Sequence, residues 1–311
     1  MEAQAILAAL GRHYDAAFTS VELHRAAGWG NATYTVSGAE HTWFLKTIHL
    51  PPTEMQTARA SMDMQVYLLK QGFPVIPIVY TRDGAPFASV AERDGEYLFV
   101  LSEFIKGGGA DKYEHLEKAG ELVGRLHRLM RDYPGELPAR DKPYFIDRYV
   151  GIMRAAGYAK WTEFQALGDE LWERVEALPR GYCHCDMYDG NVHTTESGEM
   201  YIVDFDTSCM AFPGYDVILF CNRTHYFEYD AKGWRRTKAR LKRFLPGYLR
   251  YSSLSERELA AFPAMLGIYH FQLPPAGLER NGCDAGTLEF FDKQYNWLLK
   301  WREQCAGMGI W

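Results

Sequence analysis

The feature that most constrains this chain is a pair of polar segments, each placed directly after a short apolar stretch. Residues 184–191 read His-Cys-Asp-Met-Tyr-Asp-Gly-Asn, and Asp-Phe-Asp at 204–206 follows the apolar stretch 200–203. The flanking stretches 180–184 and 192–195 have the length and composition of strands. A hairpin pair of such strands would hold the carboxylates on adjacent loops in a fixed mutual geometry.

The residue types at these positions match the needs of phosphoryl transfer. That reaction requires a carboxylate beside the attacking hydroxyl, divalent cations on the phosphates and a lysine that contacts them. Asp186 is the candidate base, while Asn191 and Asp204 carry the hard oxygen donors that Mg²⁺ prefers. The alternative is a polar loop whose side chains only form turns. The combined spacing favours the catalytic interpretation.

With this pattern the chain resembles the aminoglycoside phosphotransferase, choline kinase and homoserine kinase family, which has a protein-kinase-like fold. The resemblance implies that Asp186 is the catalytic Asp, that Asn191 and Asp204 bind Mg²⁺, and that His184 is a structural residue of the catalytic loop. Protein kinases carry Arg where this chain has Cys185, and Asp-Phe-Gly at the second site. No Ala-Pro-Glu motif follows. A small-molecule kinase is therefore favoured over a protein kinase.

The resemblance and the hydrophobic periodicity together predict an α+β, two-lobed protein-kinase-like fold. Residues 1–102 form a small N-lobe with an antiparallel sheet, 103–109 form a hinge, and 110–311 form a mostly helical C-lobe. The expected N-lobe elements are helices 5–18 and 54–70 and strands 21–27, 33–36, 42–48, 86–91 and 97–101. The expected C-lobe helices are 112–131, 144–156, 162–178, 215–226, 233–249, 256–271 and 288–303.

Nucleotide phosphates are expected on a glycine turn and a lysine of the N-lobe. Gly28, Gly30 and Asn31 lie between two strands, where backbone amides can approach phosphate oxygens closely. An ordinary hairpin turn is the alternative for this short pattern. Lys46 follows three apolar residues in the next strand, and a lysine is costly to bury there unless it meets an anion. The resemblance implies that Lys46 contacts the phosphates.

The resemblance also implies an acidic partner for Lys46 and an adenine-binding hinge. Asp63, at the midpoint of helix 54–70, is the predicted partner, and Glu54 is the alternative, placed where it serves the helix dipole. At the hinge, the carbonyl of Ser102 and the amide of Phe104 are the candidates for binding adenine. The alternative for this glycine-rich segment is a plain interdomain linker.

Three further residues have predicted supporting roles. His127 lies beside the apolar stripe of its helix and is interpreted as a buried, hydrogen-bonded histidine. Asp216 resembles an acidic residue that braces the family's catalytic loop, although a simple helix cap is an open alternative. Asp206 either widens the acidic shell of the metal or caps the next turn.

Composition and charge narrow the classes of partner that this chain is expected to bind. The net charge of −6 argues against a general nucleic-acid binder. No apolar run reaches the length of a membrane span, and the N-terminus lacks the pattern of a secretory signal, so a cytoplasmic location without membrane attachment is expected. The basic segment 232–243 is interpreted as a solvated helix face, with a partner or anionic-substrate surface as the alternative. The oligomeric state is left open.

The six cysteines, at positions 183, 185, 209, 221, 283 and 305, form no Cys-x-x-Cys pair. This spacing is typical of reduced thiols in a chain of this size. Cys183 and Cys185 flank His184, but no second ligand pair stands at a fitting distance for zinc. Packed thiols are therefore the favoured interpretation.

Together these residues predict an ATP- and Mg²⁺-dependent phosphotransferase that acts on a hydroxyl of a small molecule, with or without an amine group. The acceptor is open: an aminoglycoside wants a carboxylate-rich pocket, choline wants an aromatic cage, and homoserine or another amino alcohol fits equally well. The aromatic candidates for a cage are Tyr226, Phe227, Tyr229, Trp234, Tyr269 and Phe271, for which core packing is the alternative. A kinase-fold scaffold or spore-coat-like protein without turnover is the alternative function.

Overall fold

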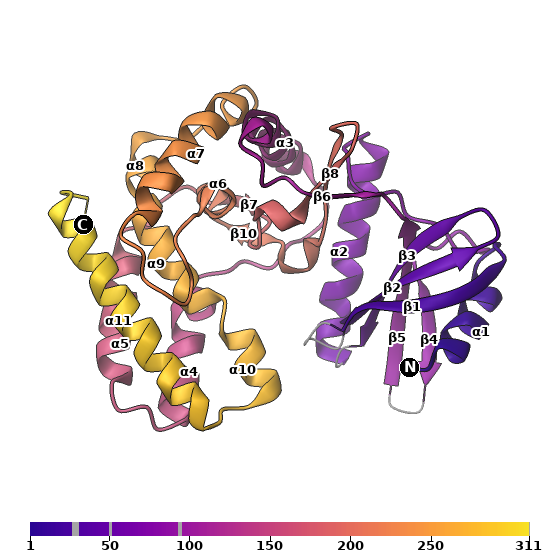
Figure 1. Cartoon of the computed structure of the whole chain (residues 1–311), viewed down its shortest axis with the longest axis horizontal. Helices are drawn as coiled ribbons and strands as arrows, with labels where there is room; N and C mark the ends of the chain where they lie inside the picture. The colour runs from indigo at the N-terminus through magenta and orange to yellow at the C-terminus, as the bar shows by residue number, and fades with distance from the viewer. Residues whose placement is uncertain (27–30, 50–51, 93–94, 311) are drawn as a thin grey trace. The chain divides into compact units, whose positions relative to one another are not determined.

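The computed structural model describes residues 1–26, 31–49, 52–92 and 95–310 (Figure 1). The chain divides into two compact units by its internal contacts. The first unit comprises Met1–Gly108, Tyr133–Glu136 and His193–Asp206, and the second comprises Gly109–Asp132, Leu137–Val192 and Thr207–Trp311. Within the described ranges, no helix combines the length and the apolar run that crossing a bilayer requires.

A five-stranded antiparallel sheet forms the centre of the first unit. Its strand order is β1-β2-β3-β5-β4. The strands are β1 (Phe18–Ala26), β2 (Asn31–Gly38), β3 (Thr42–His49), β4 (Ala88–Glu92) and β5 (Gly95–Glu103). In this register Lys46 of β3 stands between Thr33 of β2 and Val100 of β5. The lysine therefore lies in the middle of the sheet and not at an edge.

One helix covers each face of this sheet, because apolar residues alternate along the strands. Helix α1 (Ala3–His13) packs its Leu10 against Leu45 and Leu101. Helix α2 (Pro52–Lys70) packs against the opposite face, which carries Ile48 and Val100. Lys46 has the same strand parity as Ile48, so it projects from the face that α2 covers.

The remaining elements of the first unit bring a distant segment onto the sheet. The hairpin of β8 (Val192–Thr195) and β9 (Met200–Ile202) joins a short strand, β6 (Gly107–Gly109). Ile202 forms a parallel bridge with Val75, and its amide donates to the carbonyl of Pro74 at 3.2 Å. These contacts place the residues after β9, including Asp204 and Asp206, in the same unit as Lys46.

The second unit is mostly helical. Its α-helices are α3 (Leu116–Leu129), α4 (Arg148–Ala155), α5 (Trp161–Glu173), α6 (Pro213–Cys221), α7 (Gly233–Tyr248), α8 (Glu256–Ala260), α9 (Phe262–Gln272), α10 (Pro275–Asn281) and α11 (Ala285–Gly307). Helices α3 and α7 approach closely at two glycines: a Cβ on Gly120 would lie 2.2 Å from the carbonyl oxygen of Phe244, and one on Gly247 would lie 2.0 Å from that of Glu117. Only glycine fits at this crossing.

Several sequence expectations are corrected by the structure. The predicted helix 256–271 is two helices, α8 and α9, because Pro263 cannot continue the hydrogen bonding of α8. Helix α10 and strand β10 (Cys209–Ala211) were not predicted. Strand β7 (Gly181–Cys183) pairs with β10, and the predicted strands 192–195 and 200–203 form the hairpin of β8 and β9. The predicted α+β class, with an antiparallel sheet followed by helices, is confirmed.

Candidate active site

The loop between β7 and β8 holds Asp186 through its own asparagine. The amide nitrogen of Asn191 donates to the backbone carbonyl of Asp186 at 2.8 Å and to its Oδ2 at 3.0 Å. Asn191 is 5% exposed and ends the 3₁₀ turn Asp189–Asn191, so its side chain has little freedom. The amide nitrogen faces Asp186, and this arrangement leaves the Asn191 Oδ1 as the oxygen donor for a cation.

Asp216 braces the backbone of this loop from α6. Its fully buried carboxylate accepts hydrogen bonds from the amides of His184 at 2.6 Å and Cys185 at 2.9 Å. The thiol of Cys183 donates to the same carboxylate at 3.2 Å. Helix α6 is capped by Phe212, without a side-chain hydrogen bond. Of the two alternatives for Asp216, the structure therefore shows the brace and not the cap.

His127 completes the set of donors around Asp216. Its Nε2 lies 3.0 Å from Asp216 Oδ2, and its Nδ1 lies 2.9 Å from the hydroxyl of Tyr248. An ionised carboxylate can only accept, so Nε2 carries the proton and donates. Burial by itself raises the pKa of Asp216, but the His127 hydrogen bond and the surrounding donors hold the pKa below its ordinary value. The prediction of a buried, hydrogen-bonded His127 is confirmed.

Backbone strain marks both polar motifs. Cys185 has φ 66° and Asp204 has φ 62°, and no other non-glycine residue of the described ranges has a positive φ. The left-handed conformation is unfavourable for a side chain with a Cβ and persists only where surrounding contacts enforce it. At Cys185 the enforcing contact is the hydrogen bond from its amide to Asp216. Such strained residues cluster at functional sites.

Lys46 forms the second charged group, in the first unit. Its Nζ lies 3.0 Å from Asp204 Oδ1 and 2.5 Å from Asp206 Oδ2. Burial by itself lowers the pKa of Lys46, but the charges of Asp206 and Asp204 outweigh it and raise the pKa above its ordinary value. The ammonium therefore stays charged at neutral pH. Asp206, whose role the sequence left open, is an ion-pair partner of Lys46.

This pairing corrects the predicted partner of Lys46. Asp63 lies in α2 with an exposed side chain, because the neighbouring Met62 and Met64 occupy the buried side of the helix. The ion pairs of Lys46 in the described residues are with Asp204 and Asp206. Because Lys46 projects from the middle of the sheet, its side chain contacts the carboxylates of the turn after β9. These residues are far apart in the sequence, so the spacing of neighbouring residues does not predict the contact.

The structure describes only some of the other residues that were predicted to bind the nucleotide. Gly28 and Gly30 lie outside the described residues, and Asn31 begins β2. Ser102 pairs with Phe44 of β3, and Phe104 directly follows the end of β5. The amide of Glu103 donates to the carbonyl of Pro77, and the carbonyl of Leu101 accepts from the amide of Val79. Backbone groups alternate in direction along a strand, so those of Ser102 point to the other side, toward β3. Adenine binding by Ser102 and Phe104 stays a prediction.

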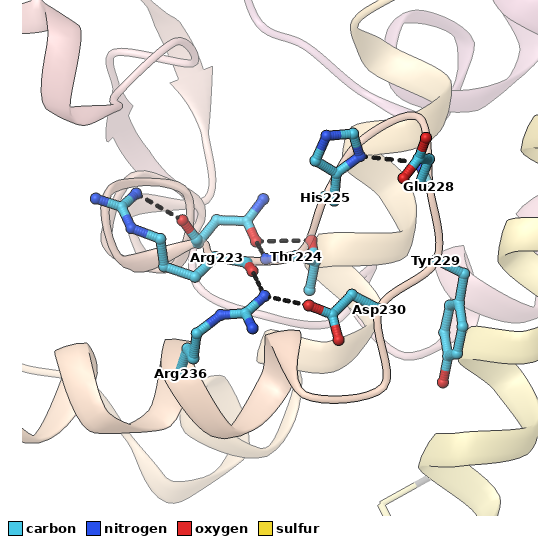
Figure 2. A pocket seen from close by; sticks show the side chains of 8 residues that line it. Arg223, Thr224, His225, Glu228, Tyr229, Asp230 and Arg236 are labelled. Carbon is cyan, nitrogen blue, oxygen red and sulfur yellow. Dashed lines mark hydrogen bonds and ion pairs between the residues drawn. The ribbon is translucent and has the colours of Figure 1, made fainter.

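A pocket of about 500 Å³ lies in the second unit, in the segment that joins α6 to α7 (Figure 2). It is lined by Asn222, Arg223, Thr224, His225, Glu228, Tyr229, Asp230 and Arg236. We call it the α6–α7 pocket. Arg236 donates to Asp230 at 2.5 Å and to the carbonyl of Arg223 at 3.1 Å. Two guanidinium groups and two carboxylates in one small concavity suit a ligand that carries both signs of charge.

Arg223 connects this pocket to the catalytic loop. Its guanidinium donates to Asp189 at 2.5 Å, and Asp189 lies three residues after Asp186. The buried Arg240 lies 3.9 Å from the same carboxylate and donates to the carbonyls of Asp111 and Phe220. Helix α7 therefore divides its basic residues. Arg236 and Arg240 turn toward the pocket and the loop, while the others form the predicted solvated face: Lys232, Arg235, Lys238, Lys242 and Arg243.

The aromatic residues that were candidates for a choline-type cage also divide into two groups. Phe271 and Trp234 are core residues with 0% and 7% exposure. Tyr226 contacts Phe227 and Tyr269 edge to face, with ring centroids 5.1 and 5.5 Å apart. Burial raises the pKa of Tyr269, and the nearby charge of Asp186 raises it further. Of the candidates for a cage, Tyr226, Phe227 and Tyr269 therefore form one contacting group, whereas Phe271 and Trp234 belong to the core.

Sequence reasoning missed Arg223 and Asp189, which link the catalytic loop to the α6–α7 pocket. Asp189 lies inside the catalytic motif and was assigned no role, and Arg223 stands in a segment with no motif. An unassigned acid within the motif was the one available signal. The residues that were predicted fall into two groups. Asp186 and Asn191 belong to the second unit, and Lys46 and Asp204 belong to the first.

Comparison with known proteins gives matches over most of the chain. The family model described as "Phosphotransferase enzyme family" matches residues 23–262. A homoserine kinase of Bradyrhizobium sp. strain BTAi1 is 24% identical over 233 residues, which cover 72% of this chain and 68% of that protein. A homoserine kinase of Beijerinckia indica is 26% identical over 255 residues, which cover 77% and 74% of the respective chains.

Solved structures share the fold over nearly the whole length. An amicoumacin kinase in complex with AMP-PNP, Ca²⁺ and Ami superposes with a TM-score of 0.75 at 20% identity, covering 98% of this chain and 94% of that chain. A microcompartment-associated aminopropanol kinase gives a TM-score of 0.76 at 17% identity, covering 99% of both chains. At these identities the likeness establishes the protein-kinase-like fold, as predicted.

Proposed function

Since this chain belongs to the phosphotransferase enzyme family and is a small-molecule kinase, we propose that it transfers the terminal phosphate of ATP, with Mg²⁺, to the hydroxyl of a small amino alcohol or hydroxylated amino acid. The observation that carries the proposal is the Asp186–Asn191 pair held by the buried Asp216. We assign Lys46 and Asp204 of the first unit to the phosphates and to the cation, respectively. The scaffold alternative is not favoured, because Lys46, Asp186, Asn191 and Asp204 are all present.

The donors present fit a hard divalent cation. Asn191 offers its Oδ1, and Asp204 offers a carboxylate whose side chain is 48% exposed. Oxygen donors of this kind suit Mg²⁺, which retains several waters and is held by one or two protein ligands together with phosphates. When bound, the cation would neutralise charge that develops on the phosphates. Lys46, kept protonated by its two carboxylates, is the protein's own cation for the same anion.

Asp186 is proposed to orient the acceptor hydroxyl and to take its proton. The hydrogen bond from Asn191 occupies Oδ2, which fixes the plane of the carboxylate. A carboxylate is a weak base early in the reaction. It suits a loose transition state in which the proton leaves late, so that orientation dominates catalysis.

The α6–α7 pocket is the proposed binding place for the charged part of the acceptor. Its arginines suit a carboxylate, and Glu228 and Asp230 suit an ammonium group. Tyr226 of the same segment and its contact partner Tyr269 are the aromatic candidates for binding the ammonium group. Homoserine, the substrate named for the sequence relatives, carries both charges and a hydroxyl. A turnover screen with homoserine, choline, aminopropanol and an aminoglycoside tests this proposal, and no ADP release with any acceptor would refute it.

Replacing Asp204 with Ala is expected to weaken binding of the Mg²⁺–nucleotide complex by at least about 10-fold, because a cation ligand is lost. Lys46 keeps Asp206 as its partner, so the fold should survive. Calorimetry with a nonhydrolysable nucleotide measures the change. Asp63→Ala is the matched control, since it removes an exposed acid of the same unit and should leave the affinity unchanged. Equal affinity in wild type and Asp204→Ala would contradict the metal assignment.

Replacing Arg236 with Ala is expected to raise the KM for the acceptor by about 10- to 100-fold, because one or two charged hydrogen bonds to the acceptor are lost. The KM for the nucleotide should stay the same. Arg235→Ala is the control, because this neighbouring arginine of α7 is exposed and does not line the pocket. Steady-state kinetics with each substrate varied separately distinguish the two constants. A nucleotide KM that rises as much as the acceptor KM would place Arg236 outside the acceptor site.

A further inference from the structure

Three cysteine side chains converge inside the second unit, next to the catalytic loop. Cys183 of β7 and Cys209 of β10 are register partners on antiparallel strands, so their side chains stand on the same face. Cys185 reaches the same place from its left-handed backbone conformation. The three Sγ atoms all lie within 4.8 Å of one another, and each residue is at most 1% exposed. We call these residues the thiol triad.

The thiol triad consists of free thiols and has a carboxylate beside it. All three cysteines are free of disulfides. The carboxylate of Asp216 adds an oxygen atom 3.2 Å from the sulfur of Cys183.

We propose that Cys183, Cys185 and Cys209 form a binding site for one soft, thiophilic divalent cation of the zinc and cadmium type. A metal–sulfur bond of about 2.3 Å requires sulfurs separated by roughly 4 Å, which the observed limit of 4.8 Å permits. Each thiol that binds the ion releases its proton to water, and the two charges of the ion offset two of the thiolates. Thiolate ligands select such ions over Mg²⁺, which prefers oxygen.

The site is separate from the proposed nucleotide site but coupled to the catalytic loop. The thiol of Cys183 is one of the donors to Asp216, and Cys185 directly precedes Asp186. A cation on these sulfurs would take the Cys183 proton away from Asp216. Residue spacing did not reveal the third ligand, because Cys209 lies on another strand, outside the ligand spacings of known zinc motifs.

Titration of chelator-treated protein with Cd²⁺ tests the proposal. We expect the ultraviolet absorption of thiolate-to-metal charge transfer to saturate at one Cd²⁺ per chain. Cys209→Ser should weaken the affinity by more than roughly 100-fold, since it removes a direct ligand. Cys283→Ser is the matched control, because Cys283 is an exposed free thiol elsewhere in the second unit, and it should leave the titration unchanged.

X-ray absorption at the cadmium edge on wild-type protein gives a second readout that does not depend on any variant being folded. Three sulfur neighbours around the ion are expected. A shell of oxygen and nitrogen neighbours would overturn the proposal, and so would a charge-transfer band that persists in folded Cys209→Ser or disappears in Cys283→Ser. Neither readout uses turnover, so failure here leaves the proposed kinase activity untouched, and failure of that activity leaves this site untouched.

Discussion

Asp186→Asn should lower kcat by about 10²- to 10⁴-fold, the usual contribution of a positioned general base. The substitution keeps the size of the side chain and an oxygen that can accept the hydrogen bond from Asn191, so the loop should keep its geometry. It removes the negative charge and the ability to take a proton from the acceptor hydroxyl. A coupled assay of ADP release at saturating substrates measures the effect.

The control for this experiment separates chemistry from binding. Calorimetry with a nonhydrolysable nucleotide should give the same affinity for wild type and Asp186→Asn, because Asp186 is not a proposed metal ligand. Asp169→Asn removes an exposed carboxylate of the same unit that pairs with Lys142 and should leave kcat unchanged. An Asp186→Asn enzyme with wild-type turnover would show that another group accepts the proton.

Asp216→Ala is expected to lower the free energy of unfolding by about 3–5 kcal/mol, the usual loss when one partner of a buried charged network is removed. Without the carboxylate, the amides of His184 and Cys185 and the Nε2 of His127 have lost their acceptor in a dry interior. Urea denaturation measures the change. Asp83→Ala, a surface substitution, should stay within about 0.5 kcal/mol of wild type.

The same carboxylate makes the stability difference depend on pH. The folded state holds the pKa of Asp216 below its ordinary value of about 4, so its stabilisation is complete above that value and is lost as the pH falls toward the lowered folded-state pKa. Denaturation curves of wild type and Asp216→Ala should therefore differ most at neutral pH and converge in acid. A difference that is constant from neutral to acid pH would contradict the ionised brace.

Local sequence patterns were sufficient to predict the longer helices and strands and the catalytic motif. Strand alternation around Leu45 and Lys46 and helical periodicity around Leu122 and Leu126 both predicted the element observed. The family resemblance carried by residues 184–191 and Asp204 is confirmed by the family match. These predictions held because side-chain periodicity and turn composition act within a few residues. Helix α10 and strand β10 were missed, because short elements have too few residues to display a period.

The partners of buried charges were not accessible to the same reasoning. Lys46 was expected to meet Asp63 on the next helix, but it pairs with Asp204 and Asp206, about 160 residues further along the chain. Two roles for Asp216 were open, a helix cap or a brace of the catalytic loop. The four hydrogen-bond donors around its carboxylate establish the brace. The thiol triad likewise depends on the pairing of β7 with β10. Strand pairing joins residues of any sequence separation, so spacing cannot predict it.

Residue identity alone determined which chemistry this protein has at hand: a carboxylate, two oxygen ligands and a lysine at family spacing, together with the alternation of strands and the period of helices. Tertiary structure decided which of those groups touch, which carboxylate neutralises Lys46, and that Arg223 ties the α6–α7 pocket to the catalytic loop. The reason is physical: backbone periodicity is a property of adjacent residues. The stability of a buried charge, in contrast, depends on whichever distant groups the packed fold brings within hydrogen-bonding distance.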